Sequence, residues 1–123
     1  MQILGNTVVF ALLYILFMIP TYILPFFGSN STGLNAIAGA AGVLSPLFLL
    51  HLGFLAALVL GAWFRGCLVQ KRWLTIFPLL AMVFDLVPVL NSIPFVPTLM
   101  HLLTIIIGVM SVSPVHAERI SAV

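Results

Sequence analysis

The chain has 123 residues, of which 63% are hydrophobic and only 5% are charged. Because a soluble domain carries about 25% charged residues, this composition excludes a water-soluble globular protein and predicts one embedded in a lipid bilayer. The formal net charge of +2 comes from four basic and two acidic residues, which is too little positive charge to attract a nucleic-acid partner. The single cysteine excludes an internal disulfide.

Four segments are long and apolar enough to be membrane spans, for which about 20 mostly apolar residues are needed. They cover, approximately, residues 3–27, 44–64, 73–91 and 95–112. We expect the first to be a retained span, because no basic residue precedes it and its apolar run exceeds the signal-peptide length of about 7–15 residues. The prediction is therefore an all-α, polytopic membrane protein. Residues 1–123 form a single domain of four transmembrane helices, packed as two hairpins in a compact bundle.

The basic residues indicate how these spans are oriented. Arg65, Lys71 and Arg72 lie between the second and third spans, and Arg119 lies in the C-terminal tail. All four therefore share one side of the membrane, which the positive-inside rule assigns to the cytoplasm. We predict a multi-pass protein of the cell (inner) membrane with both termini in the cytoplasm.

Asp85 is the acidic residue of the predicted spans, and it needs a partner. A lone Asp at the centre of a transmembrane helix costs about 2.5–3.5 kcal/mol. With a rise of about 1.5 Å per residue, counting from the outer end of each span places His51 and His101 at the same depth as Asp85. Thr21 and Tyr22 of the first span reach a similar level. We predict that these five residues form a polar cluster inside the bundle.

Three roles are compatible with this cluster. The expected one is structural, an Asp–His hydrogen bond that holds helices together. The second is a path for protons or ions, because ionisable groups at membrane depth tend to mark such paths. The third is a metal site, with two histidines as axial haem ligands or with the aspartate as zinc ligands. Neither metal has a specific signature here, and we expect no metal and no cofactor.

Small residues on the second span predict a surface for close helix packing. Gly53, Ala57 and Gly61 recur every four residues, and such a small-xxx-small face lets another helix approach closely. His51 projects from roughly the opposite side, so we expect neighbours on both flanks of this span. Small and polar residues also line one face of the fourth span, which we expect to face the bundle or a partner: His101, Thr104, Gly108 and Ser111.

The two predicted hairpins resemble each other weakly. The first reads LLYILFMIP and then SPLFLLHL, and the second reads LLAMVFDLVP and then VPTLMHLL. A duplication would relate them about an axis along the membrane normal. Apolar sequences align readily, so a duplication and a chance likeness both stay open.

No soluble catalytic motif is present, because the chain lacks a Gly-rich phosphate loop, a nucleophile elbow, CxxC and HExxH. We therefore expect a non-enzymatic integral membrane protein. It would act as an accessory, assembly or immunity-type subunit through helix–helix contacts in the lipid bilayer, with another membrane protein or a second copy as its partner. The alternative is a small oligomeric proton-coupled transporter or channel that uses Asp85 and the two histidines.

Overall fold

A computed structural model of the chain describes residues 2–27, 46–87 and 95–111, together with residues 90, 93, 118 and 121–123. In this described part the protein forms four α-helices and no strand, which confirms the predicted all-α fold. The α-helices are α1 (Thr7–Ile23), α3 (Pro46–Leu68), α4 (Ile76–Leu86) and α5 (Phe95–Met110). Three short 3₁₀ segments accompany them, namely η1 (Gln2–Gly5), η2 (Leu24–Phe27) and η3 (Arg72–Thr75).

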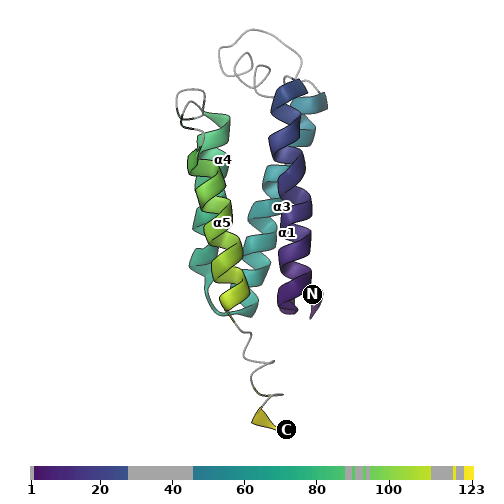
Figure 1. The fold of residues 1–123 in the computed structure, drawn as a ribbon, viewed down its shortest axis with the longest axis vertical. Coiled ribbons are helices and arrows are strands. Elements are labelled where there is room, and N and C mark those ends of the chain that lie inside the picture. Colours follow the sequence, from purple (N-terminus) through teal and green to yellow (C-terminus); the bar gives the residue numbers. More distant parts are fainter. Residues whose placement is uncertain are drawn as a thin grey trace.

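The four helices run roughly along the long axis of the molecule and form two pairs (Figure 1). α1 packs closely on α3, and α4 packs closely on α5. Contacts of α1 with α5 and of α3 with α4 join the two pairs. The start of α1 meets the ends of α3 and α5 at what we call the Arg65 end, which comprises Leu4, Gly5, Thr7, Arg65, Gly108 and Ser111. The opposite Asp85 end comprises Tyr22, His51, Asp85 and Thr98.

Two helical segments in the described residues are long and apolar enough to cross a membrane. They are Thr7–Phe27, which combines α1 with η2, and Pro46–Leu68, which is α3. Only 22% of the apolar window of each is buried within the molecule, whereas the core helix of a soluble protein is mostly buried. α5 is a shorter apolar helix of 16 residues. The two long segments therefore indicate association with a membrane.

Polar side chains are buried alongside the apolar core, while many large apolar side chains are exposed. The buried polar or charged residues are Thr21, His51, Arg65, His101, Thr104 and Ser111. By contrast, Phe26, Phe95 and Met110 are 89%, 81% and 77% exposed. An apolar surface of this kind is unusual in a soluble monomer. In a bilayer, lipid chains would cover it, while the polar groups would be hydrogen-bonded internally.

α3 continues to Leu68, beyond the end at residue 64 that the sequence predicts. It ends in a Schellman motif, in which Gln70 adopts a φ of 57° and the amide of Lys71 donates to the carbonyl of Gly66 at 2.7 Å. A Cβ at Gly66 would lie 2.8 Å from the Lys71 carbonyl oxygen, so this turn favours glycine there. As a result, Arg65 lies inside the helix and not in the loop where the sequence analysis placed it.

α4 is shorter than the segment 73–91 that the sequence predicts. η3 begins at Arg72, and the α-helix itself ends at Leu86. Val87 is extended, with φ −87° and ψ 117°, as expected of a residue that precedes a proline in the sequence. Asp85 therefore lies in the last turn of α4.

Candidate functional site

Asp85 pairs with His51, so the structure brings together two members of the predicted polar cluster. His51 Nε2 on α3 lies 2.6 Å from Asp85 Oδ2 on α4, a short hydrogen bond between an imidazole and a carboxyl group. The His51 side chain is 1% exposed and the Asp85 side chain 16% exposed. His51 also makes an interaction beyond this bond. The pair joins α3 to α4 at the Asp85 end.

His101 bonds to a residue that the sequence analysis did not single out. Its Nδ1 lies 2.9 Å from the hydroxyl of Tyr14 on α1, and both side chains are buried. The two rings meet edge to face, with centroids 5.8 Å apart. No hydrogen bond joins Asp85 to His101 in the described structure. The predicted cluster is therefore divided into separate pairs.

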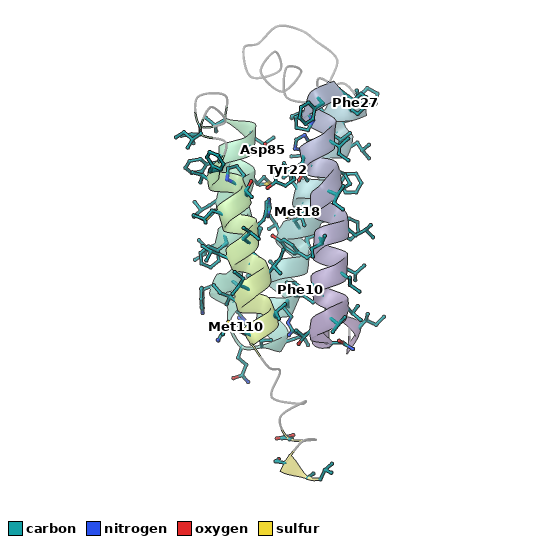
Figure 2. All side chains as sticks on the ribbon, in the orientation of Figure 1. Phe10, Met18, Tyr22, Phe27, Asp85 and Met110 are labelled. Carbon is teal, nitrogen blue, oxygen red and sulfur yellow. The ribbon has the colours of Figure 1, made fainter. Side chains whose placement is uncertain are left out.

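The two predicted members on α1 behave differently from each other. The Tyr22 hydroxyl donates to Thr98 Oγ1 on α5 at 2.9 Å. The Thr21 hydroxyl is buried but donates to the Met18 carbonyl of its own helix at 2.7 Å. Figure 2 shows Tyr22 and Asp85 at a similar height along the molecule, nearer to Phe27 than to Met110. Tyr22 thus shares the level of Asp85, whereas Thr21 satisfies its own helix.

Arg65 forms the most extensive polar contact in the described structure. Its side chain is 0% exposed, although the sequence analysis treated it as a loop residue that sets the topology. Its guanidinium donates to the carbonyl oxygens of Leu4 (2.8 Å), Gly5 (2.7 Å), Gly108 (3.1 and 3.0 Å) and Ser111 (2.9 Å), and to Thr7 Oγ1 (3.0 Å).

The physical reason for this arrangement lies at the end of α5. The last four carbonyls of a helix have no partner within the helix, and they carry the negative end of its dipole. A guanidinium offers five N–H donors in one plane, which suits several acceptors at once. Arg65 uses them on Gly108 of α5, on Ser111 directly after α5, and on the segment that begins α1. It therefore ties three segments together without a carboxylate among these contacts.

Phe10 and Gly108 complete the Arg65 end. The centroid of the Phe10 ring lies 5.5 Å from the Arg65 guanidinium carbon, within the range of a cation–π interaction. A Cβ at Gly108 would lie 2.4 Å from the Phe10 ring, so α5 approaches α1 as closely as it does because residue 108 is glycine. The inner face of α5 is the one the sequence predicts, with His101, Thr104, Gly108 and Ser111 all buried.

The predicted packing face on α3 is open in the described structure. A Cβ at Gly53 or at Gly61 would meet nothing within 4 Å. Ala57 and Gly61 line an apolar groove of about 370 Å³ between α1 and α3, together with Phe10, Phe17 and Phe64 among others. A second apolar groove of about 220 Å³ includes Gly53, and it shares Ala57 and Phe17 with the first. The face therefore lies along the outer seam of the first helical pair.

The predicted topology-setting residues separate into two kinds. Lys71 and Arg72 are exposed between α3 and α4, as a loop position requires, whereas Arg65 is buried. Arg119 lies outside the described residues. Among the described residues, Lys71 and Arg72 are therefore exposed basic residues of the loop, whereas Arg65 takes part in contacts between helices.

The residues considered for a metal are not assembled into a ligand set. Among the described residues, no three His, Cys, Asp or Glu side chains lie close enough together to hold a metal ion. His51 and Asp85 instead bond to each other across two helices, and His101 bonds to Tyr14 of α1. In comparisons with protein-family models, with curated proteins and with solved structures, no match to this chain was found.

Proposed function

We propose that the protein is a multi-pass integral membrane protein of the cell (inner) membrane, with four spans and both termini in the cytoplasm. Two long apolar segments and the apolar outer surface support the membrane environment. α4 and α5 run alongside the two long helices, which supports two further spans (Figure 1). Lys71 and Arg72 support the orientation, because both are exposed between α3 and α4 and the positive-inside rule assigns such basic loops to the cytoplasm.

Cysteine labelling of intact cells tests this topology. The native Cys67 is exposed and lies at the Arg65 end, so a membrane-impermeant maleimide should reach it only after the membrane is permeabilised. A cysteine placed at position 31, in a Cys67→Ser background, should react from outside without permeabilisation. Labelling of Cys67 in intact cells would contradict the proposed orientation.

Within the membrane, we propose that the protein acts as a non-enzymatic accessory, assembly or immunity-type subunit that binds the transmembrane helix of another membrane protein. The observation that carries this proposal is the open small-residue face on α3. Gly53 and Gly61 have room for a Cβ, so their small size is not required by packing within the described chain. Small residues allow close approach of a helix backbone. Packing against the helix of a partner would explain why these positions are small.

The polar interior also supports this proposal, because almost all of its described side chains are hydrogen-bonded within the protein. Of the described buried side-chain polar atoms, only Thr75 Oγ1 lacks a hydrogen-bond partner. The described grooves are lined mainly by apolar residues, and Asp85, His51 and His101 are absent from their linings. The polar groups are therefore engaged in holding the fold, and the outer face of the first pair is left for a partner.

Two matched substitutions on α3 test this function. Ala57→Leu would fill the groove, whereas Ala56→Leu makes the same change on the adjacent, exposed position. We expect recovery of a co-purifying membrane protein, or of the oligomer, to fall at least about tenfold for Ala57→Leu and to stay at the parent level for Ala56→Leu. Native mass analysis after extraction in a mild detergent measures both. Equal recovery for the two variants would count against the proposed face.

A second candidate function is proton-coupled transport by an oligomer, and the His51–Asp85 pair is the observation that favours it. An imidazole 2.6 Å from a carboxylate is a geometry in which a proton can be held and transferred. Asp85→Asn keeps the shape of the side chain but does not ionise. If the protein moves protons, this variant should fold and assemble normally and lose pH-driven flux in proteoliposomes. If the pair is structural, parent and variant should show the same background leak.

A further inference from the structure

Among the described residues, the hydrogen bonds between polar side chains of different helices cross, with one exception, from one helical pair to the other. Tyr14–His101 and Tyr22–Thr98 join α1 to α5, and His51–Asp85 joins α3 to α4. The exception is Arg65–Thr7, which lies within the first pair. Inside the first pair, by contrast, the seam between α1 and α3 is lined by apolar side chains. The described structure is therefore two helical pairs whose mutual boundary contains these polar bonds, together with apolar contacts such as that of Ile105 on α5 with the core around Phe10.

At the Arg65 end, this boundary is held in three independent ways. Residues 69–75 connect α3 to α4, so the only covalent link between the two pairs lies here. Arg65 donates three hydrogen bonds from α3 to the carbonyls of Gly108 on α5 and Ser111 directly after it. Bonds from a charged donor are roughly twice as strong as bonds between neutral groups. Phe10 also packs directly against Gly108, so the two pairs are in close contact.

At the Asp85 end, the described part of the boundary is weaker. Two side-chain hydrogen bonds cross it, His51–Asp85 and Tyr22–Thr98. In the order of the chain, η2 is followed by α3 and α4 by α5, so the chain connects helices of the same pair at these two steps and provides no covalent link across the boundary there. Asp85 supplies one of these two bonds through His51 of α3, and the other joins Tyr22 of α1 to Thr98 of α5.

We propose that the two helical pairs separate at the Asp85 end while the Arg65 end stays closed and acts as the pivot. The movement carries Asp85 and Thr98 away from His51 and Tyr22. It opens a polar cleft at the end of the molecule that faces away from Lys71 and Arg72. This proposal concerns the fold alone and holds whichever partner occupies the outer face of α3.

Distance measurements by double electron–electron resonance in lipid vesicles test the proposal directly. The background variant is Cys67→Ser, and spin labels are attached to cysteines at exposed positions. Ile23→Cys with Phe95→Cys spans the boundary at the Asp85 end, and Val8→Cys with Met110→Cys spans it at the Arg65 end. We expect a broad or two-component distance distribution for the first label pair and a single narrow one for the second.

A label pair within one helical pair provides the control. Ile23→Cys with Leu47→Cys reports on α1 and α3 at the same end of the molecule and should give a narrow distribution. A broad distribution for this control as well would show fraying of the helix ends and would overturn the proposal. Equal breadth at the Asp85 and Arg65 ends would overturn it too.

Removal of the bonds at the Asp85 end sharpens the test. Asp85→Ala combined with Tyr22→Phe deletes the two hydrogen bonds described across the boundary at this end. We expect the long-distance component at this end to rise about eightfold relative to the short one, the ratio that corresponds to two interhelical bonds of average strength in membranes. The distribution between positions 8 and 110 should not change. An unchanged distribution between positions 23 and 95, in a variant that keeps the narrow control distances, would falsify the pivot.

Discussion

The two ends of the molecule use polar side chains in opposite ways. At the Arg65 end, one buried cation donates six hydrogen bonds, five of them to backbone carbonyls, and thereby joins η1 and α5 to α3. At the Asp85 end, two pairs of side chains bond to each other one to one. Backbone acceptors at a helix end have few other partners available inside a membrane. Loss of their donor therefore costs more than loss of one member of a side-chain pair.

This difference teaches that the charge of a side chain does not reveal its role in a membrane protein. Asp85 attracts attention because a carboxylate is costly in an apolar span. Arg65 carries a charge of the same magnitude and is more deeply buried. It donates six hydrogen bonds, whereas two side-chain hydrogen bonds are described at the Asp85 end. The free energy of unfolding should therefore depend most on the Arg65 end.

The largest expected effect is that of Arg65→Met. The substitution keeps an unbranched side chain but leaves the carbonyls of Leu4, Gly5 and Ser111 without their donor. Each buried polar group left unsatisfied costs about 1–3 kcal/mol, so we expect a loss of at least about 3 kcal/mol in the free energy of unfolding. Denaturation in mixed detergent micelles measures it. Arg65→Lys should lie between the parent and Arg65→Met, because an ammonium has three donors and no planar fork.

Arg72→Met is the matched control for this prediction. Arg72 is exposed on η3, so the same change there should leave the free energy of unfolding nearly unaltered. If Arg65→Met proved no more destabilising than Arg72→Met, the guanidinium would not be the main connection at this end.

The second largest effect is expected from Gly108→Ala. The new methyl group would overlap the Phe10 ring, and inserting a methyl group into a well-packed site costs about 1–3 kcal/mol. Combining it with Phe10→Leu should recover part of this loss, because the smaller side chain leaves room. Gly53→Ala is the control, since its Cβ meets nothing within 4 Å and alanine favours the helix. A double-mutant cycle in the same denaturation assay measures the coupling, and additive effects would contradict the close contact.

The sequence predicts the framework of this fold well. Apolar runs separated by short polar segments predict the helices, and the spacing of His101, Thr104, Gly108 and Ser111 predicts the buried face of α5. Helix periodicity alone is enough for both, because side chains three or four residues apart share a face. The boundaries are less predictable. α3 runs past residue 64 because a Schellman turn at Gln70, and not the first charged residue, ends the helix.

The partners of the polar residues are harder to read from the sequence. Counting residues places Asp85, His51 and His101 at one depth, yet depth does not fix how each helix is rotated. His101 pairs with Tyr14, a residue that counting depth along the helices does not select. The sequence predicts a loop position for Arg65, because arginine is expected at membrane boundaries. A usable signal existed in its spacing, because His51, Leu55, Leu58, Ala62 and Arg65 follow one helical stripe.

A smaller effect is expected from Tyr14→Phe. The variant keeps the aromatic ring, which packs in the core with Phe10, and removes only the hydroxyl bonded to His101. Interhelical hydrogen bonds in membranes average about 0.6 kcal/mol and reach about 1.7 kcal/mol. Because both groups are buried, we expect a loss near the upper value. Nitrogen NMR of the His101 ring provides a second readout, since the Nδ1 resonance should move in Tyr14→Phe and stay unchanged in Tyr22→Phe.

The smallest effect is expected from Tyr22→Phe at the Asp85 end. Tyr22 is 38% exposed, and its hydroxyl makes one bond, to Thr98. Once the tyrosine hydroxyl is gone, Thr98 can turn toward the carbonyl three residues earlier in its own helix, as Thr21 already does with the Met18 carbonyl at 2.7 Å. Neither group is then left unsatisfied, so the loss should not exceed the membrane average of about 0.6 kcal/mol. The cycle of Tyr22→Phe with Thr98→Val isolates this bond. If its coupling energy exceeded that of Tyr14 with His101, the Asp85 end would be held more firmly than the middle of the boundary, and the contrast between the two ends would fail.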